Sequence, residues 1–337
     1  MQTFWASVIV FGLLIFFHEL GHFAIAKLVG IKVQEFSLGF GPRLLGLKWG
    51  ETAYNLRLLP LGGFVRMAGM DPEEDEDERG FNKKTVGQRV GVIFAGPLMN
   101  FLLAVGLLAV LFMVQGVPVP TTQVETVWPG RPAEKAGFVT GDRIVAVDGR
   151  IVQEWQDVSE LISRRPGEQL AVRVERQGRE ITLLVTPEAD ERGRGKIGIS
   201  PRQVQKSLSL PAACWMGVKY TLQVTGLIII FIGHMITGQA PPDLGGPVRV
   251  VAEIGKAARM GVSHLVQLAA FLSINLGLFN LFPIPALDGS RIMFLLLEKL
   301  RGRPVDPRKE NFIHLVGFGL LLLLIVVITY NDILQLM

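Results

Sequence analysis

Two histidines four residues apart lie inside an apolar run that is long enough to cross a membrane. Residues 4–17 carry no charge, and residues 23–29 continue the apolar pattern with one lysine. His18 and His22 would share one face of a helix and can bind one zinc ion, and Glu19 is placed to accept a proton from water on that ion. Because a charge in a membrane helix costs roughly 2.5–3.5 kcal/mol on insertion scales, these residues predict a metal site at membrane depth.

Composition agrees with a membrane protein that carries a polar insert. The chain is 49% hydrophobic with a mean hydropathy of +0.39, although its middle third is ordinary in polarity. No Lys or Arg precedes the first apolar run and no small-x-small site ends it, so we expect a membrane helix rather than a secretory signal peptide. The net charge is only +4, and basic residues do not alternate with aromatic residues along the sequence, so we expect no nucleic-acid partner.

Four segments are expected to cross the bilayer, at residues 4–29, about 90–114, about 265–282 and about 312–330. Lys and Arg are concentrated in residues 27–89 and 299–309, which the positive-inside rule places in the cytoplasm. The apolar stretch 224–236 is shorter, and if it crossed, the second basic segment would emerge outside. We therefore expect it to lie flat in the interface. The acidic run 71–78 is expected to be a solvated loop.

The polar insert contains a specific sequence pattern. A short helix over 133–136 is stopped by Gly137, and the run Gly-Asp-Arg-Ile-Val-Ala-Val-Asp-Gly follows at 141–149. Strands are expected at 170–176 and 180–186. The insert resembles a circularly permuted bacterial PDZ domain, a module that binds peptides as an added strand. Its alternative role is that of a spacer or size filter.

Two histidines do not complete a catalytic zinc site, so a third ligand is expected far along the chain. The best candidate is Asp288, which follows Pro283 and Pro285 at a break in the third apolar segment. Irregular backbone at membrane depth must line a cavity within the protein. The alternative role for Asp288 is capping of the helix expected over 291–300, and both roles can hold.

These motifs together resemble the site-2 protease family of intramembrane zinc metalloproteases, in the branch of the regulator of sigma-E protease. The resemblance rests on His18–His22, on Asn275 and the run from Asn280 to Gly289, and on Gly96 and Asn100, which match the family's Gly-x-x-x-Asn element. It extends over essentially the whole chain. Two departures are Ser290, where that branch has a second glycine, and one PDZ domain where enterobacterial members have two.

The resemblance implies roles for individual residues. His18, His22 and Asp288 would hold Zn²⁺, Glu19 would be the general base, and Asn275 and Asn280 would contact the substrate. Residues 51–70 look like the family's membrane-dipping β-hairpin, whose edge can pair with an unwound substrate helix. The implied activity is cleavage of single-span membrane proteins, such as trimmed anti-sigma factors, within or beside the bilayer.

The expected fold is a polytopic α-helical membrane protein with about four transmembrane helices, a membrane-dipping β-hairpin and an inserted β-rich PDZ domain. Residues 1–116 hold the first two spans and the hairpin, 117–190 the PDZ domain, 191–262 a linker with interfacial helices, and 263–337 the last two spans. The expected location is the bacterial cytoplasmic membrane, with the PDZ domain outside the cytoplasm and open to a peptide or a substrate ectodomain. A catalytically silent PDZ scaffold and a metal transporter are the alternatives.

Overall fold

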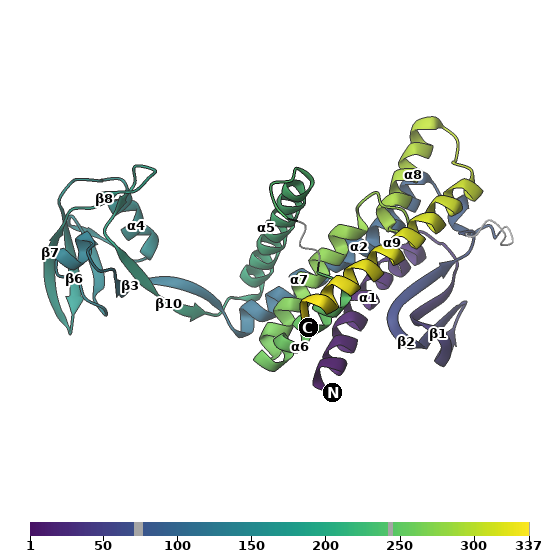
Figure 1. Ribbon diagram of the computed structural model, residues 1–337, viewed down its shortest axis with the longest axis horizontal. Helices are drawn as coiled ribbons and strands as arrows, with labels where there is room; N and C mark the ends of the chain where they lie inside the picture. Colours follow the sequence, from purple (N-terminus) through teal and green to yellow (C-terminus); the bar gives the residue numbers. More distant parts are fainter. Residues whose placement is uncertain (71–76, 242–244, 337) are drawn as a thin grey trace. The chain divides into compact units, whose positions relative to one another are not determined.

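The computed structural model describes residues 1–70, 77–241 and 245–336, and it divides into two compact units (Figure 1). We call residues Met1–Met113 with Ser209–Met337 the helical unit, and Val114–Leu208 the β-rich unit. The acidic run expected as a solvated loop lies for the most part outside the described residues.

Among the described residues, the structure contains five helices that are long and apolar enough to cross a membrane. They are α1 (Gln2–Leu28), α2 (Val86–Val114), α5 (Leu210–Ile236), α7 (Val262–Asn280) and α9 (Pro307–Leu336). Two shorter helices, α6 (Pro247–Met260) and α8 (Asp288–Arg301), and the 3-10 turn η1 (Phe81–Lys83) complete the helical unit. In each of the five long helices, no more than 33% of the most apolar stretch is buried in the isolated chain, as expected for helices that a bilayer would surround.

The stretch 224–236 is not short in the structure. It forms the second half of the 27-residue helix α5, whose first half holds Lys219 and Gln223 and was therefore not recognised as an apolar run. Pro211 in the first turn fits a helix start at this point. Length no longer distinguishes this helix from the other four, and the expected count of four spans rests on the charge distribution alone.

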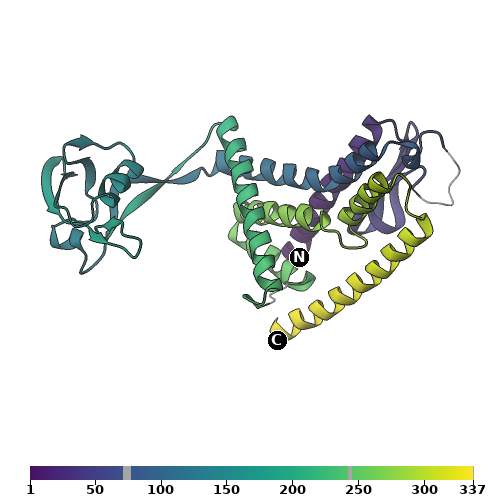
Figure 2. The same cartoon turned by 90° about the horizontal axis from the view of Figure 1, so that it is seen from above.

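The β-hairpin is larger than the sequence indicates. Strand β1 (Val33–Trp49) pairs antiparallel with β2 (Thr52–Met67), and Phe36 pairs with Tyr54 on one side and with Val65 on the other. Residues 33–38 therefore form a central segment between two parts of β2, and residues 63–67 lie at one edge. The expected hairpin over 51–70 omitted β1 because its glycines and Pro42 interrupt the alternation of apolar and polar residues. Both strands contact α1 (Figure 2).

The β-rich unit is built on one antiparallel sheet. Its strand order is β10 (Ile199–Lys206), β3 (Val117–Val127), β4 (Arg143–Val147), β6 (Leu170–Arg176) and β7 (Arg179–Val185). The two-residue strand β5 (Arg150–Ile151) pairs with β4, and β8 (Glu188–Ala189) pairs with β9 (Gly195–Lys196). Helices α3 (Pro132–Lys135) and α4 (Trp155–Ser163) complete the unit.

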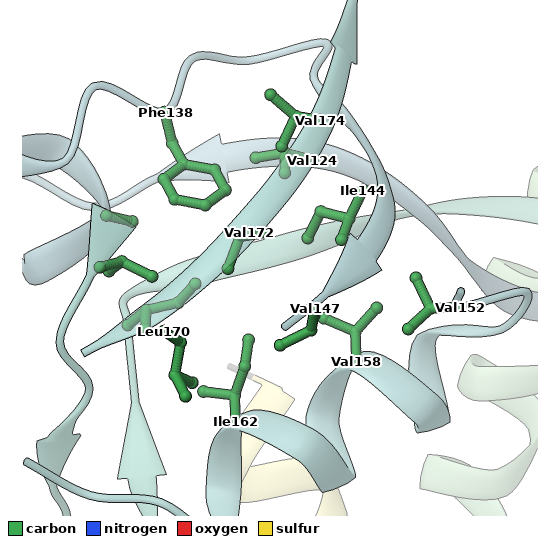
Figure 3. Packing of buried hydrophobic residues seen from close by; sticks show 13 residues of the cluster. Val124, Phe138, Ile144, Val147, Val152, Val158, Ile162, Leu170, Val172 and Val174 are labelled. Carbon is green, nitrogen blue, oxygen red and sulfur yellow. The ribbon is translucent and has the colours of Figure 1, made fainter. Parts of the chain in front are cut away.

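The core of the β-rich unit is a single apolar cluster (Figure 3). Val158 and Ile162 of α4 pack towards Val147, Leu170 and Val172 of the sheet. The expected boundary at residue 190 falls inside this unit, because β10 pairs with β3 from Val117 to Val127. The sequence did not indicate β10, since Pro201 and five polar or charged residues break its alternation.

Candidate metal centre

Three side chains converge at one point in the helical unit. The Nε2 atoms of His18 and His22 are 3.2 Å apart, and Asp288 Oδ2 lies 3.1 Å from His18 Nε2 and 3.4 Å from His22 Nε2. The three side chains are 12%, 9% and 18% exposed, respectively. The structure thus brings together the three residues that the sequence predicts as metal ligands, although Asp288 is 270 residues after His18 in the sequence.

Helix geometry places the two histidines, and a chain break places the aspartate. His18 and His22 are separated by about one turn of α1. Helix α7 ends at Asn280, and Asp288 is the first residue of α8, preceded by Leu287 in an extended conformation. At Gly289 a Cβ atom would meet the carbonyl oxygens of residues 281 and 282 at 2.3 Å. Glycine after Asp288 therefore lets the start of α8 lie against the end of α7.

The donor set fits a divalent cation. Asp288 Oδ2 is buried and has no hydrogen-bond partner among the described residues. A buried carboxylate oxygen without a hydrogen bond is costly unless a cation compensates it. Two imidazole nitrogens and one carboxylate oxygen are ligands that zinc prefers, and three protein ligands are typical of a catalytic zinc site.

Glu19 lies next to the first histidine and borders the edge of the hairpin. A Cβ atom at Gly63 would lie 3.0 Å from both Glu19 Cγ and Ile15 Cγ2. The absence of a side chain at Gly63 therefore allows the edge segment of β2 to approach the predicted base closely. This places a strand edge, which can accept another strand, beside Glu19.

The two asparagines predicted to contact substrate lie on α7, away from these contacts. The Asn275 side chain donates to the Phe271 carbonyl, one turn earlier, at 2.8 Å. Both Asn275 and Asn280 are half-buried. Within the described residues, neither makes a hydrogen bond to His18, His22 or Asp288, so their predicted roles remain predictions.

Asn100 also lies beside the metal centre, and the sequence predicted no role for it. Its side-chain amide lies 3.1 Å from His18 Nδ1, and the residue is fully buried. The available signal was its polarity, because an amide within the otherwise apolar run 90–114 is a functional candidate.

The chain is similar to known zinc metalloproteases. The family model described as peptidase family M50 matches residues 6–324. The chain is 35% identical to "Zinc metalloprotease RasP" of Geobacillus kaustophilus, over 99% of this chain and 98% of that protein. It is 34% identical to "Regulator of sigma-W protease RasP" of Bacillus subtilis, over 99% and 98% respectively. It is also 37% identical to "Putative zinc metalloprotease CA_C1796" of Clostridium acetobutylicum, over 97% and 96%.

Proposed function

Because this chain belongs to peptidase family M50, we propose that His18, His22 and Asp288 hold the zinc ion of an intramembrane metalloprotease and that Glu19 is its general base. The observation that carries this assignment is the convergence of the three ligand atoms within 4.8 Å of one another. His18 and His22 lie on the same helix as Glu19, and Asp288 comes from α8. A transporter or a silent scaffold would not need a carboxylate between two histidines at this spacing.

The chemistry divides between the metal and the chain. When bound, zinc acts as a Lewis acid and activates water for attack on a peptide carbonyl. Glu19 accepts the proton of the attacking water and delivers it to the departing amine. His18, His22 and Asp288 would hold the ion, and the low exposure of their side chains limits the access of bulk water to the site.

The substrate we propose is a single-span membrane protein. A transmembrane helix holds its peptide groups in internal hydrogen bonds, so it must unwind before hydrolysis. Residues 63–67 of β2 form a strand edge beside Glu19, and this edge can pair with the unwound segment. Asn275 and Asn280 would contact the substrate. A trimmed anti-sigma factor is one substrate of this kind, in keeping with the name of the sigma-W relative.

The β-rich unit is proposed to select substrates as a PDZ domain rather than to take part in hydrolysis. Among its described residues, no three metal-ligating side chains converge, whereas the helical unit holds one such group. A free peptide end or a bulky substrate ectodomain could be recognised or excluded there.

Metal analysis of the purified protein tests the ligand assignment. The unaltered protein is expected to bind one zinc ion, and His22→Phe to lose it. His234→Phe is the matched control, because His234 is an exposed residue near the end of α5. Full zinc content in His22→Phe would overturn the assignment.

The proposed location is the bacterial cytoplasmic membrane, with both chain ends and the β-rich unit outside the cytoplasm. Single cysteines introduced at Arg79, Arg303 and Arg150 in a Cys214→Ala background test this. The first two should be shielded from a reagent that cannot cross the membrane, and the third should react. Reaction at position 79 from the outer face would contradict the orientation, and a C-terminus inside the cytoplasm would show that α5 spans.

A further inference from the structure

One face of α2 contacts both histidines of the metal centre from behind. Val92, Gly96 and Asn100 are spaced four residues apart and therefore lie along one side of the helix. Each of them meets a histidine ring, although none of the three supplies an atom to the group of convergent ligands.

The contact at Val92 determines which nitrogen of His22 is free. The Nδ1 atom of His22 lies 2.9 Å from the Val92 carbonyl oxygen in a buried environment. A carbonyl can only accept, so Nδ1 carries the proton and donates it. The lone pair of the neutral ring is then on Nε2, the atom that faces Asp288 and His18.

Gly96 provides the space that the His22 ring occupies. A Cβ atom at Gly96 would lie 2.3 Å from Nε2 and 2.5 Å from Cε1 of that ring. On the facing helix, a Cβ atom at Gly21 would lie 2.2 Å from the Ala95 carbonyl oxygen. Two glycines thus allow α1 and α2 to approach closely at the metal centre.

Asn100 stands in the same relation to His18 as Val92 does to His22. Its amide is 3.1 Å from His18 Nδ1, while its Oδ1 atom is buried without a hydrogen-bond partner among the described residues. Turning the amide group by 180° would place Oδ1 against Nδ1, so that the oxygen accepts a hydrogen bond from the ring N–H. This orientation satisfies the orphaned oxygen and leaves the Nε2 lone pair of His18 free for the metal.

Helix α7 holds Asn100 in place from the other side. The Ser273 hydroxyl donates to the Asn100 backbone carbonyl at 2.7 Å, and both residues are fully buried. This hydrogen bond fixes the backbone of Asn100, from which the side-chain amide extends towards His18.

We propose that α2 orients the zinc ligands, with Asn100 as a positioning residue that accepts a hydrogen bond from Nδ1 of His18. The Val92 carbonyl accepts the corresponding hydrogen bond from His22, and Gly96 leaves space for the His22 ring. This inference rests on the proposed function. Hydrogen bonds to the far nitrogen of a ligating histidine fix the ring and its tautomer, and their loss typically lowers metal affinity 10–100-fold.

Zinc affinity of the full-length protein in detergent, measured by competition with a chromogenic chelator, tests the proposal. Asn100→Leu removes the acceptor at similar volume and should weaken zinc binding about 10–100-fold. Asn100→Asp keeps an oxygen acceptor and should bind zinc nearly as tightly as the unaltered protein. If Asn100 served packing alone, the order would reverse, because leucine suits this buried apolar site and an added carboxylate does not.

A glycine pair on the same helix provides the matched comparison. Gly96→Ala places a methyl group where the His22 ring lies and should lower zinc affinity at least about tenfold, whereas Gly106→Ala meets no atom within 4 Å and should not change it. Equal zinc affinity in Asn100→Leu and the unaltered protein would overturn the proposal, as would loss of the metal-free fold in both Asn100 variants. Absence of zinc from the unaltered protein would overturn the proposed function instead.

Discussion

The helical unit and the β-rich unit bury different kinds of side chain. The β-rich unit encloses one apolar cluster, and Asp142 is its only fully buried charged residue among those described. The helical unit buries His22, Asn100, Ser273 and Ser290 near its metal centre, while many of its large apolar side chains are exposed. In the β-rich unit, the hydrophobic effect drives apolar side chains out of water and into the core. The helical unit would be surrounded by lipid, where packing and polar contacts at its centre replace that driving force.

The two units also differ in how they surround a buried aspartate. Asp142 accepts two hydrogen bonds from the Arg176 guanidinium, at 2.7 and 2.9 Å, and one from the Val139 amide at 3.0 Å. Asp288 faces only histidine nitrogens, and its Oδ2 atom has no hydrogen bond among the described residues. A fully paired carboxylate stabilises a fold, whereas an unpaired one is suited to bind a cation.

The largest expected effect separates chemistry from metal binding within the helical unit. Glu19→Gln keeps the shape of the side chain but cannot accept a proton, so cleavage should fall at least about 10²–10⁴-fold. Zinc content should stay unchanged, because Glu19 is not among the convergent ligands. Cleavage assays on a reconstituted single-span substrate, together with metal analysis of the same sample, measure both quantities. Turnover close to that of the unaltered protein would place the base elsewhere.

A pair of aspartate variants tests the comparison between the units. Asp142→Ala leaves Arg176 without its partner and should lower the free energy of unfolding of the β-rich unit by about 3 kcal/mol, the lower end for a buried pair because Arg176 is 30% exposed. Asp288→Ala should abolish zinc binding without destabilising the metal-free helical unit. Thermal unfolding and zinc content measured for both variants give the result. The contrast fails if Asp142→Ala loses zinc or if Asp288→Ala retains it.

Local patterns in the sequence predict part of the site, and tertiary contacts supply the rest. His18, Glu19 and His22 follow from one helical turn, and Asp288 follows from the prolines that break the apolar run. The partner of His22 could not be predicted in this way, because it is the backbone carbonyl of Val92, which no side-chain pattern reveals. Asn100 was marked by its match to a family element and by its polarity within an apolar run, but its contact with His18 depends on the crossing of α1 and α2.

The fold shows the same limit. Strand β6 matches the predicted range 170–176, and β7 begins one residue earlier than expected. Strands β1 and β10 escaped prediction because Gly, Pro and charged residues interrupt their alternation, and long-range pairing stabilises them instead. Helix α5 was underestimated because a lysine and a glutamine divide its apolar content.

Removing the β-rich unit tests whether it acts only in selection. Val117 pairs with Lys206 at the base of the unit, so excision of residues 117–206 with a short linker leaves ends that already lie together. An excision ending at residue 187 would instead leave β10 without β3. The shortened protein should keep its zinc, cleave a short trimmed substrate at a similar rate and also cleave longer substrates that the intact protein refuses. Loss of the short-substrate activity in a folded, zinc-loaded sample would mean that this unit helps to build the active site.

The smallest expected effect lies in the turn between β8 and β9. The Arg194 and Arg192 amides donate to the Asp190 carboxylate at 2.9 Å, and Lys196 lies 3.2 Å away. These contacts, the Arg194 amide foremost, lower the pKa of Asp190 from 3.8 to about 2. A carboxyl whose pKa is lower in the folded state stabilises that state above its ordinary pKa, and this contribution disappears as the pH falls through the folded value. The turn should therefore loosen between about pH 4 and pH 2.

Pepsin, which is active in that range, should cut residues 188–196 of the full-length protein progressively faster as the pH is lowered. In Asp190→Asn the cutting rate, corrected for pepsin activity on an unfolded peptide, should be nearly constant across the range. Glu191→Gln, which alters an exposed neighbour, should behave like the unaltered protein. The same pH dependence in Asp190→Asn as in the unaltered protein would assign the effect to another group.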